Sequence, residues 1–115
     1  MTTFMCKQYE HTIVITNRAL VQGDFFKQMQ KVIQLHPHAV ILREKDLSDE
    51  EYEVLAEKLL SLCKEEKVDC FLHSRISVAY RLGCKRIHLS IPSLEAMDEE
   101  KYSQLKKEFQ EISVS

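Results

Sequence analysis

Five short apolar runs alternate with stretches of helical periodicity along the chain. The runs are Thr12–Thr16, Ala39–Leu42, Asp69–Leu72, Arg86–Leu89 and Ile112–Val114. Most of their residues are β-branched or aliphatic, which favours short strands that are buried on both faces. Strands that alternate with helices form a parallel sheet with right-handed crossovers. The sequence therefore predicts an α/β fold of parallel βα repeats.

Capping signals mark where the intervening helices begin and end. Asp24 can cap a helix that stops before Pro37. Ser48 and Glu51 have the spacing of a capping box, and Gly83 suits a helix C-terminus. Further helices are expected over Ile76–Leu82 and Asp98–Phe109. In the helix after Ser48, the sequence predicts a buried face formed by Leu55, Leu59 and Leu62.

Two folds fit this order of strands and helices. One is the first half of a (β/α)8 barrel, a fold that normally needs about 250 residues. The other is an open, five-stranded, doubly wound sheet. In both, ligands bind beyond the C-terminal ends of the parallel strands.

Composition narrows the class of protein. The 115 residues are 44% hydrophobic and 30% charged, which is typical of one soluble domain. The net charge of −2 gives no basic surface for nucleic acid, and no apolar run is long enough to span a membrane. The N-terminal residues lack the apolar core of a signal peptide. Cys6, Cys63, Cys70 and Cys84 form no CxxC pair, so we expect reduced thiols in a cytoplasmic protein.

Basic residues follow the second strand directly. Arg43 and Lys45 lie at the ligand side of the sheet, with a helix N-terminus starting at Ser48. Two cations and a helix N-terminus suit a phosphate or pyrophosphate group. The alternative is that Arg43, Glu44 and Lys45 pair with one another at the rim.

Other strand ends carry hydroxyl, imidazole and basic groups. His73 and Ser74 follow the third strand, and His88 lies within the fourth. Their chemistry suits a phosphate pocket and is poor for Mg²⁺, which prefers carboxylates and water. For His88 two interpretations stay open, a buried core histidine or a wall of the pocket.

The runs IVITNR, VILREKDLS, LHSR and LGCKRIHLS follow one another in order between roughly residues 11 and 94. This pattern resembles the thiamine phosphate synthase family and its relatives, the TenI-type thiazole tautomerases. The resemblance implies the N-terminal half of a (β/α)8 barrel. It also implies coupling of hydroxymethylpyrimidine pyrophosphate with thiazole phosphate, with Mg²⁺ as cofactor. By the same resemblance, Arg43 and Lys45 would hold pyrophosphate or phosphate, and Ser115 aligns with a phosphate-contacting serine.

The sequence departs from the family pattern at the positions where the family holds its metal ion. The Asp and the Asn of the I-N-D-R motif are Ser74 and His73 here, and the Asp of the fourth-strand motif aligns with Ser93. A serine hydroxyl lacks the negative charge that holds Mg²⁺. We therefore expect no retained Mg²⁺ and no other cofactor.

The motifs and their departures leave three functions open. They are a divergent synthase, a thiazole tautomerase, and a non-catalytic binding or regulatory protein for phosphorylated ligands. The chain is interpreted as one partial domain over residues 1–115. A half barrel exposes the apolar edge of an open sheet. Three alternatives therefore stay open: a homodimer, rearrangement into an open-sheet fold that is complete by itself, or a fragment of a longer gene product.

Overall fold

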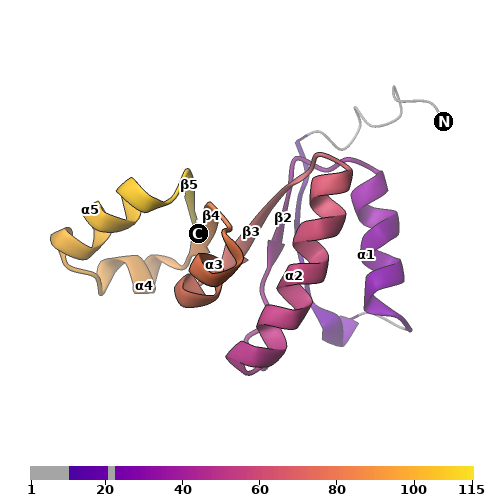
Figure 1. The fold of residues 1–115 in the computed structure, drawn as a ribbon, viewed down its shortest axis with the longest axis horizontal. Helices are drawn as coiled ribbons and strands as arrows, with labels where there is room; N and C mark the ends of the chain where they lie inside the picture. The colour runs from indigo at the N-terminus through magenta and orange to yellow at the C-terminus, as the bar shows by residue number, and fades with distance from the viewer. Residues whose placement is uncertain (1–10, 21–22) are drawn as a thin grey trace.

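A computed structural model describes residues 11–20 and 23–115, and it contains one five-stranded parallel sheet (Figure 1). The strands are β1 (Ile13–Ile15), β2 (Ala39–Leu42), β3 (Asp69–His73), β4 (Arg86–Leu89) and β5 (Glu111–Val114). The helices are η2 (Arg18–Leu20), α1 (Phe25–Gln34), α2 (Asp49–Glu65), α3 (Ile76–Leu82), α4 (Ile91–Glu95) and α5 (Glu99–Glu108). The predicted α/β fold of parallel repeats is confirmed.

The strand order is β1-β2-β3-β4-β5, with β1 and β5 at the two edges of an open sheet. Right-handed crossovers between strands in this order bring every connecting helix to the same face. A doubly wound sheet instead reverses its strand order partway and carries helices on both faces. The topology is therefore that of the first half of a barrel, and the doubly wound alternative is not observed.

The predicted caps are present. The Asp24 carboxylate accepts hydrogen bonds from two backbone N–H groups of α1, Ser48 and Glu51 form the reciprocal capping box of α2, and Gly83 ends α3 with a φ of 69°. The sequence did not reveal η2 or α4. Helix α4 begins after Ser90, whose hydroxyl caps it, and it has Pro92 in its first turn.

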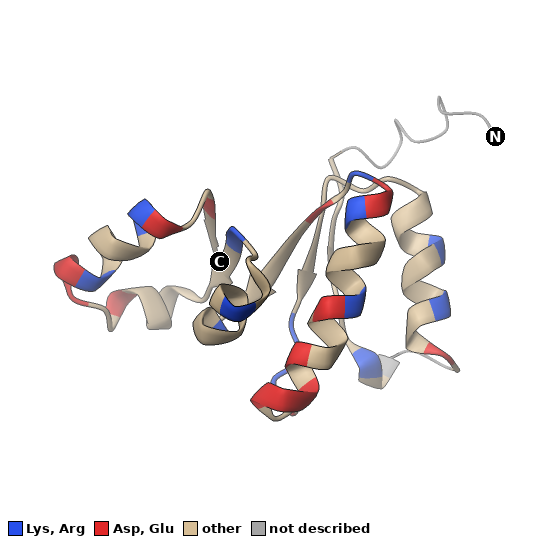
Figure 2. Cartoon of the chain, in the orientation of Figure 1, with Lys and Arg blue, Asp and Glu red and all other residues tan. Residues whose placement is uncertain are grey.

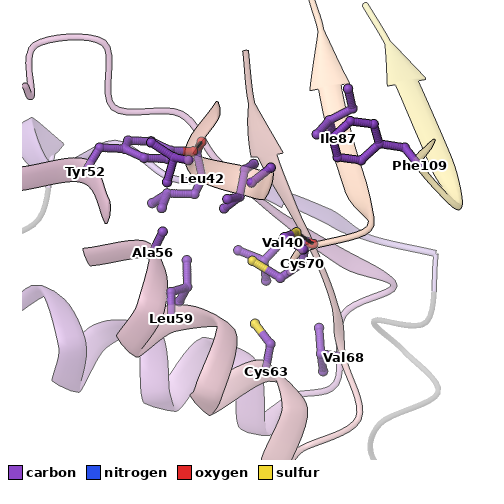
Figure 3. Packing of buried hydrophobic residues seen from close by; sticks show 14 of the residues in the cluster. Val40, Leu42, Tyr52, Ala56, Leu59, Cys63, Val68, Cys70, Ile87 and Phe109 are labelled. Carbon is purple, nitrogen blue, oxygen red and sulfur yellow. Dashed lines mark hydrogen bonds between the residues drawn. The ribbon is translucent and has the colours of Figure 1, made fainter. Parts of the chain in front are cut away.

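The core lies between the sheet and the helices. Val40, Leu42, Cys70, Leu72, Ile87 and Leu89 alternate along their strands and form one cluster with the helices. Figure 3 shows Tyr52, Ala56, Leu59 and Cys63 of α2 packing toward this face. Of the predicted apolar face of α2, Leu59 is buried in this cluster, and Leu55 and Leu62 are partly buried against it. The fully buried positions of α2 are Tyr52, Ala56, Leu59 and Cys63, which follow one another at helical spacing.

The opposite face of the sheet is lined by the alternate strand residues. Ala39, Ile41 and Phe71 form a separate small apolar cluster there. Ile13 and Ile15, on edge strand β1, have 52% and 54% of their surface exposed. The sheet therefore has one face covered by helices and one that remains largely open at the β1 edge.

Surface charges and thiols follow the expected pattern. Figure 2 shows acidic and basic residues interspersed along α2, with acidic residues gathered at its start. Cys63, Cys70 and Cys84 are free and buried, and Cys6 lies outside the described residues. Among the helices of the described ranges, none has the length and apolarity to cross a bilayer.

Tyr52 joins the core to the ligand-side edge of the sheet. Its hydroxyl donates to the Leu42 carbonyl at 2.7 Å and accepts from the His73 backbone N–H at 3.2 Å. Burial raises the pKa of Tyr52, so the phenol keeps the proton that it donates. One hydroxyl thus satisfies two buried backbone groups where β2 and β3 end.

We expect Tyr52→Phe to lower the free energy of unfolding by about 1–3 kcal/mol, because both backbone groups lose their partner. Urea denaturation measures this change. Tyr80→Phe is the matched control, since the Tyr80 side chain is 48% exposed. Equal stability of the two variants would contradict the role given to the Tyr52 hydroxyl.

Candidate functional site

The Glu44 side chain is buried at the C-terminal end of the sheet and ties the first strand to the loop after the second. Only 6% of Glu44 is exposed. Its carboxylate accepts from the Thr16 hydroxyl at 2.8 Å, from the Arg18 Nε at 3.1 Å and from the Arg18 backbone N–H. The Thr16 hydroxyl in turn accepts from the Arg43 backbone N–H at 3.0 Å. Pairing of Glu44 with Arg43 and Lys45 at the rim was therefore a wrong alternative.

Arg43 and Lys45 flank the buried Glu44 and are themselves exposed. Within the described part of the chain, neither side chain makes a hydrogen bond or an ion pair. Both line a cleft of about 410 Å³ that also includes Thr16, Asn17 and Arg18. Two unneutralised cations thus face the same cleft beyond the C-terminal ends of β1 and β2.

The nearby acidic residue is already paired. The Arg18 guanidinium donates to both Asp46 carboxylate oxygens at 2.8 Å. This contact lowers the pKa of Asp46. Arg18 is thus shared between Glu44 and Asp46, so the three cations of the cleft, with Arg43 and Lys45, exceed its two carboxylates by one positive charge.

The start of α2 adds little to this anion site. The Ser48 hydroxyl already accepts from the Glu51 backbone N–H, and the first turn carries three carboxylates, Asp49, Glu50 and Glu51. Negative charge at a helix N-terminus stabilises the helix and repels a further anion. The candidate site therefore depends on Arg43 and Lys45 rather than on the helix dipole.

Arg75 holds the loop that carries these cations. Its guanidinium donates to the carbonyls of Glu44 and Leu47 at 3.0 and 2.7 Å and to Asp49 at 2.6 Å. It also stacks 4.5 Å from the centre of the Tyr52 ring. With these contacts Arg75 positions the β2–α2 loop.

His73, His88 and Ser115 form a hydrogen-bonded row on the face opposite the helices. His73 and His88 are register partners in β3 and β4, and their Nδ1 atoms are 2.8 Å apart. The His88 Nε2 lies 2.8 Å from the Ser115 Oγ. Both histidines are buried, with 6% and 4% of their surface exposed. His88 is buried on this face, behind His73, and it is not among the residues that line either cleft.

Both imidazoles are kept neutral. Burial, the neighbouring His88 and the charges of Arg43 and Lys45 lower the pKa of His73 to about 4. Burial and the Arg43 charge lower the pKa of His88 as well. At neutral pH the pair therefore holds no net charge.

A second cleft, of about 380 Å³, lies between the ends of β2, β3 and β4. Lys45, His73, Ser74, Ser90 and Ser93 are among the residues that line it. Ser74 has a φ of 63°, an uncommon conformation for a serine. Lys45 and Glu44 are shared by both clefts, so the two form one continuous polar edge.

This donor set does not fit Mg²⁺. Glu44 is the one carboxylate lining the second cleft, and both of its oxygens are taken by Thr16 and Arg18. Ser74 and Ser93 offer only hydroxyls, and the Ser93 hydroxyl accepts from that of Ser90. No group of three or more His, Cys, Asp or Glu side chains in the described residues is arranged to hold a metal ion.

The structure brings the sequence-predicted residues to one edge, in two groups. Arg43 and Lys45 share the first cleft, while Lys45, His73 and Ser74 share the second. His88 lies behind His73 and connects it to Ser115. The sequence analysis missed the roles of Glu44 and Tyr52. Their only signal was position: Tyr52 lies four residues after the Ser48 cap, on the buried side of α2.

Comparisons with known proteins agree with this architecture. A family model described as thiamine monophosphate synthase matches residues 12–109. A thiamine-phosphate synthase of Campylobacter jejuni is 29% identical over 84 residues, which cover 73% of this chain and 40% of that protein. A putative thiamine-phosphate synthase 2 of Aquifex aeolicus is 31% identical over 75 residues, which cover 65% of this chain and 40% of that protein.

A solved structure shares the fold. It is a thiamine phosphate pyrophosphorylase from Pyrococcus furiosus, with a TM-score of 0.73 and 19% sequence identity. The match covers 94% of this chain and 51% of the other. The chain thus spans about half the length, or less, of the proteins that it matches.

We expect stability to fall in mild acid because of the histidine pair. Unfolded His73 binds a proton below its ordinary pKa of 6.5, whereas folded His73 does so only near 4. The unfolded state therefore holds more protons between these values. The free energy of unfolding then decreases as the pH falls through this window, by up to about 1.4 kcal/mol per pH unit for one proton.

Urea denaturation between pH 7.5 and 4.5 measures this slope. His73→Asn should flatten it, and the exposed His38→Asn should keep the slope of the unchanged protein. Parallel curves for all three proteins would mean that His73 is not the group responsible.

Proposed function

The chain belongs to the thiamine monophosphate synthase family, and we propose that it binds a phosphorylated thiamine precursor between Arg43 and Lys45. The observation that carries this proposal is the pair of unpaired cations in one cleft at the C-terminal edge of the sheet. In parallel α/β folds, ligands bind at this edge. Family membership supports a role in thiamine biosynthesis.

The chemistry of the cleft suits a pyrophosphate or phosphate ester. A guanidinium can donate two parallel hydrogen bonds to phosphate oxygens, and an ammonium adds a point charge. The loop that bears them is fixed from two sides, by Glu44 toward β1 and by Arg75 toward β3. Preorganised cations bind an anion without the cost of ordering the loop.

For catalysis, the synthase reaction of the family is the first candidate and thiazole tautomerisation the second. Coupling releases pyrophosphate, and the cationic cleft would stabilise its developing charge. Because the donor set does not fit Mg²⁺, no metal-dependent step is proposed for this chain. A tautomerase needs proton transfer rather than metal, and the histidine pair favours it. A protein that binds the ligand without turnover is the remaining alternative.

The proposal includes a cytoplasmic location, because the described cysteines are free thiols. A turnover assay with both thiamine precursors, with and without Mg²⁺, separates the three functions. Coupling of the two precursors, with or without Mg²⁺, would indicate a synthase, and conversion of the thiazole tautomer alone would indicate a tautomerase. Binding without either reaction would indicate a non-catalytic protein.

We expect Arg43→Ala and Lys45→Ala each to weaken pyrophosphate binding about tenfold, since a hydrogen bond to a charged group contributes roughly 1.5–3 kcal/mol. Isothermal titration calorimetry measures the dissociation constant. The double variant should lose about a hundredfold. Its melting temperature should be unchanged, because neither side chain makes a hydrogen bond within the described structure.

Lys31→Ala combined with Lys107→Ala is the charge-matched control. Both lysines are exposed on helices, outside the residues that line the two clefts. Equal loss of affinity in the control would show that only net charge matters. Unchanged affinity in the Arg43 and Lys45 double variant would refute the site.

The open edge of the sheet leads to a second part of the proposal, a homodimer. Within the described residues, strands β1 and β5 each pair with one neighbour only, and Ile13 and Ile15 are more than half exposed on the uncovered face. The solved relative is about twice as long as the matched region, so a second copy would supply a comparable length of βα repeats. Apolar strand edges favour pairing with another sheet.

Light scattering after size exclusion should therefore give twice the 13.5 kDa mass of the chain. Ile15→Lys should shift the protein to a monomer, because it places a charge on the uncovered face. Val54→Lys is the control, since Val54 is similarly exposed at 59% but lies on α2. A monomer that melts cooperatively would rule out the homodimer.

A further inference from the structure

We propose that His73, His88 and Ser115 form a proton relay that exchanges protons with a bound phosphorylated ligand at its His73 end and with water at its Ser115 end. The relay rests on the proposed function, because Arg43 and Lys45 must hold the ligand beside it. It names the groups that would carry out acid–base chemistry at this site. The geometry of the row carries the inference.

Strand register creates the row. His73 and His88 are direct partners in parallel strands, so their side chains lie on the same face. His88 is also the partner of Ser113, and Ser115 lies two residues further along the same chain direction. The contacts of 2.8 Å, from Nδ1 to Nδ1 and from Nε2 to Oγ, are hydrogen-bond distances.

A contact between two Nδ1 atoms requires one proton between them. A neutral imidazole carries a proton on one nitrogen and a lone pair on the other. If the His73 Nδ1 carries the proton, the His88 Nδ1 accepts it, and the His88 Nε2–H donates to Ser115. If the His88 Nδ1 carries the proton, the His73 Nδ1 accepts, and the His88 Nε2 accepts from the Ser115 hydroxyl. The two arrangements are linked tautomers of the same row.

Switching between them moves one proton through the protein without changing its charge. In the first arrangement the His73 Nε2 has a free lone pair, which can take a proton from the ligand. The Nδ1 proton of His73 then passes to the His88 Nδ1, and the Nε2 proton of His88 passes to the Ser115 Oγ. The hydroxyl proton of Ser115, at an exposed position, goes to water, so one proton enters the row and one leaves. The reverse shift takes a proton from water at the Ser115 Oγ and gives the Nε2 proton of His73 to another atom of the ligand. The two shifts together complete a tautomerisation and restore the first arrangement.

The surroundings keep the row neutral and place one end at the ligand. His73 lines the second cleft together with Lys45 and Ser74, and its Nδ1 is engaged with His88, which leaves Nε2 for the ligand. Arg43 and Lys45, from the β2–α2 loop, are the charged groups that act on the pair, and they oppose its protonation. Two added protons would place an N–H group on both Nδ1 atoms, which the contact of 2.8 Å between them does not accommodate.

Nuclear magnetic resonance of the full chain labelled with ¹⁵N-histidine tests the row directly. At pH 7.5 we expect scalar coupling across the hydrogen bond between the Nδ1 nuclei of His73 and His88. One histidine should carry its proton on Nδ1 and the other on Nε2, or the two should exchange. Both rings as Nε2–H tautomers without coupling would overturn the relay.

Turnover separates the relay from phosphate binding. The probe is the non-aromatic tautomer of thiazole phosphate, whose conversion is followed by ultraviolet absorbance. His73→Asn and Ser115→Ala should each slow conversion about a hundredfold, the lower range for general acid–base catalysis. Ser115→Ala should keep its pyrophosphate dissociation constant within twofold of the unchanged protein, because Ser115 lines neither cleft. Ser115→Ala, at an exposed position, should keep the coupling between the histidines and thus show that the fold is intact.

The two proposals fail in different ways. If the unchanged protein binds pyrophosphate and the thiazole tautomer but converts the tautomer no faster than buffer, the relay is wrong and the binding site stands. If Arg43→Ala with Lys45→Ala leaves pyrophosphate affinity unchanged, the binding site is wrong. Conversion that survives Ser115→Ala at the full rate would also overturn the relay.

Discussion

The buried carboxylate of Glu44 is the contact on which the arrangement of the ligand-side edge depends. A charge at 6% exposure is stable only when it is paired and hydrogen-bonded, and Glu44 meets this condition through Thr16 and Arg18. These bonds draw the end of β1 against the loop after β2. With Glu44 occupied, the flanking Arg43 and Lys45 have no acidic partner and remain exposed. A stabilising ion pair thus leaves two cations free for a ligand.

The sequence predicted most of the elements because their signals are local. Strand β2, helix α3, the caps at Asp24 and Ser48, and the C-terminal Gly83 rest on neighbouring residues, and each is present. Contacts between elements have no such signal. From the sequence, Glu44 could pair with its neighbours Arg43 and Lys45 at the rim of the sheet. Nothing near it in the chain shows that its partners are Arg18 and Thr16, 26 and 28 residues away. Likewise, the meeting of His73 with His88 follows only from the register between β3 and β4.

Ser74 holds the end of β3 in an uncommon backbone conformation. Its φ of 63° is left-handed, a conformation that Asp and Asn adopt more readily than Ser. Its backbone N–H donates to the His88 carbonyl at 2.9 Å, so this conformation holds the β3 end against β4. The contact with β4 therefore stabilises a conformation that this residue type does not favour. Beside Ser74 in the second cleft lies His73, one member of the imidazole pair.

The uncovered face of the sheet links assembly to that pair. His73 and His88 lie on the same side of their strands as Phe71, while Ile13 and Ile15 leave the β1 edge of this side open to water. Desolvation is the largest cause of the lowered pKa of both histidines. A second sheet placed over this face would remove more water from the imidazoles and disfavour their charged forms further. Burial of this face in the proposed homodimer would therefore keep the histidine pair more firmly neutral.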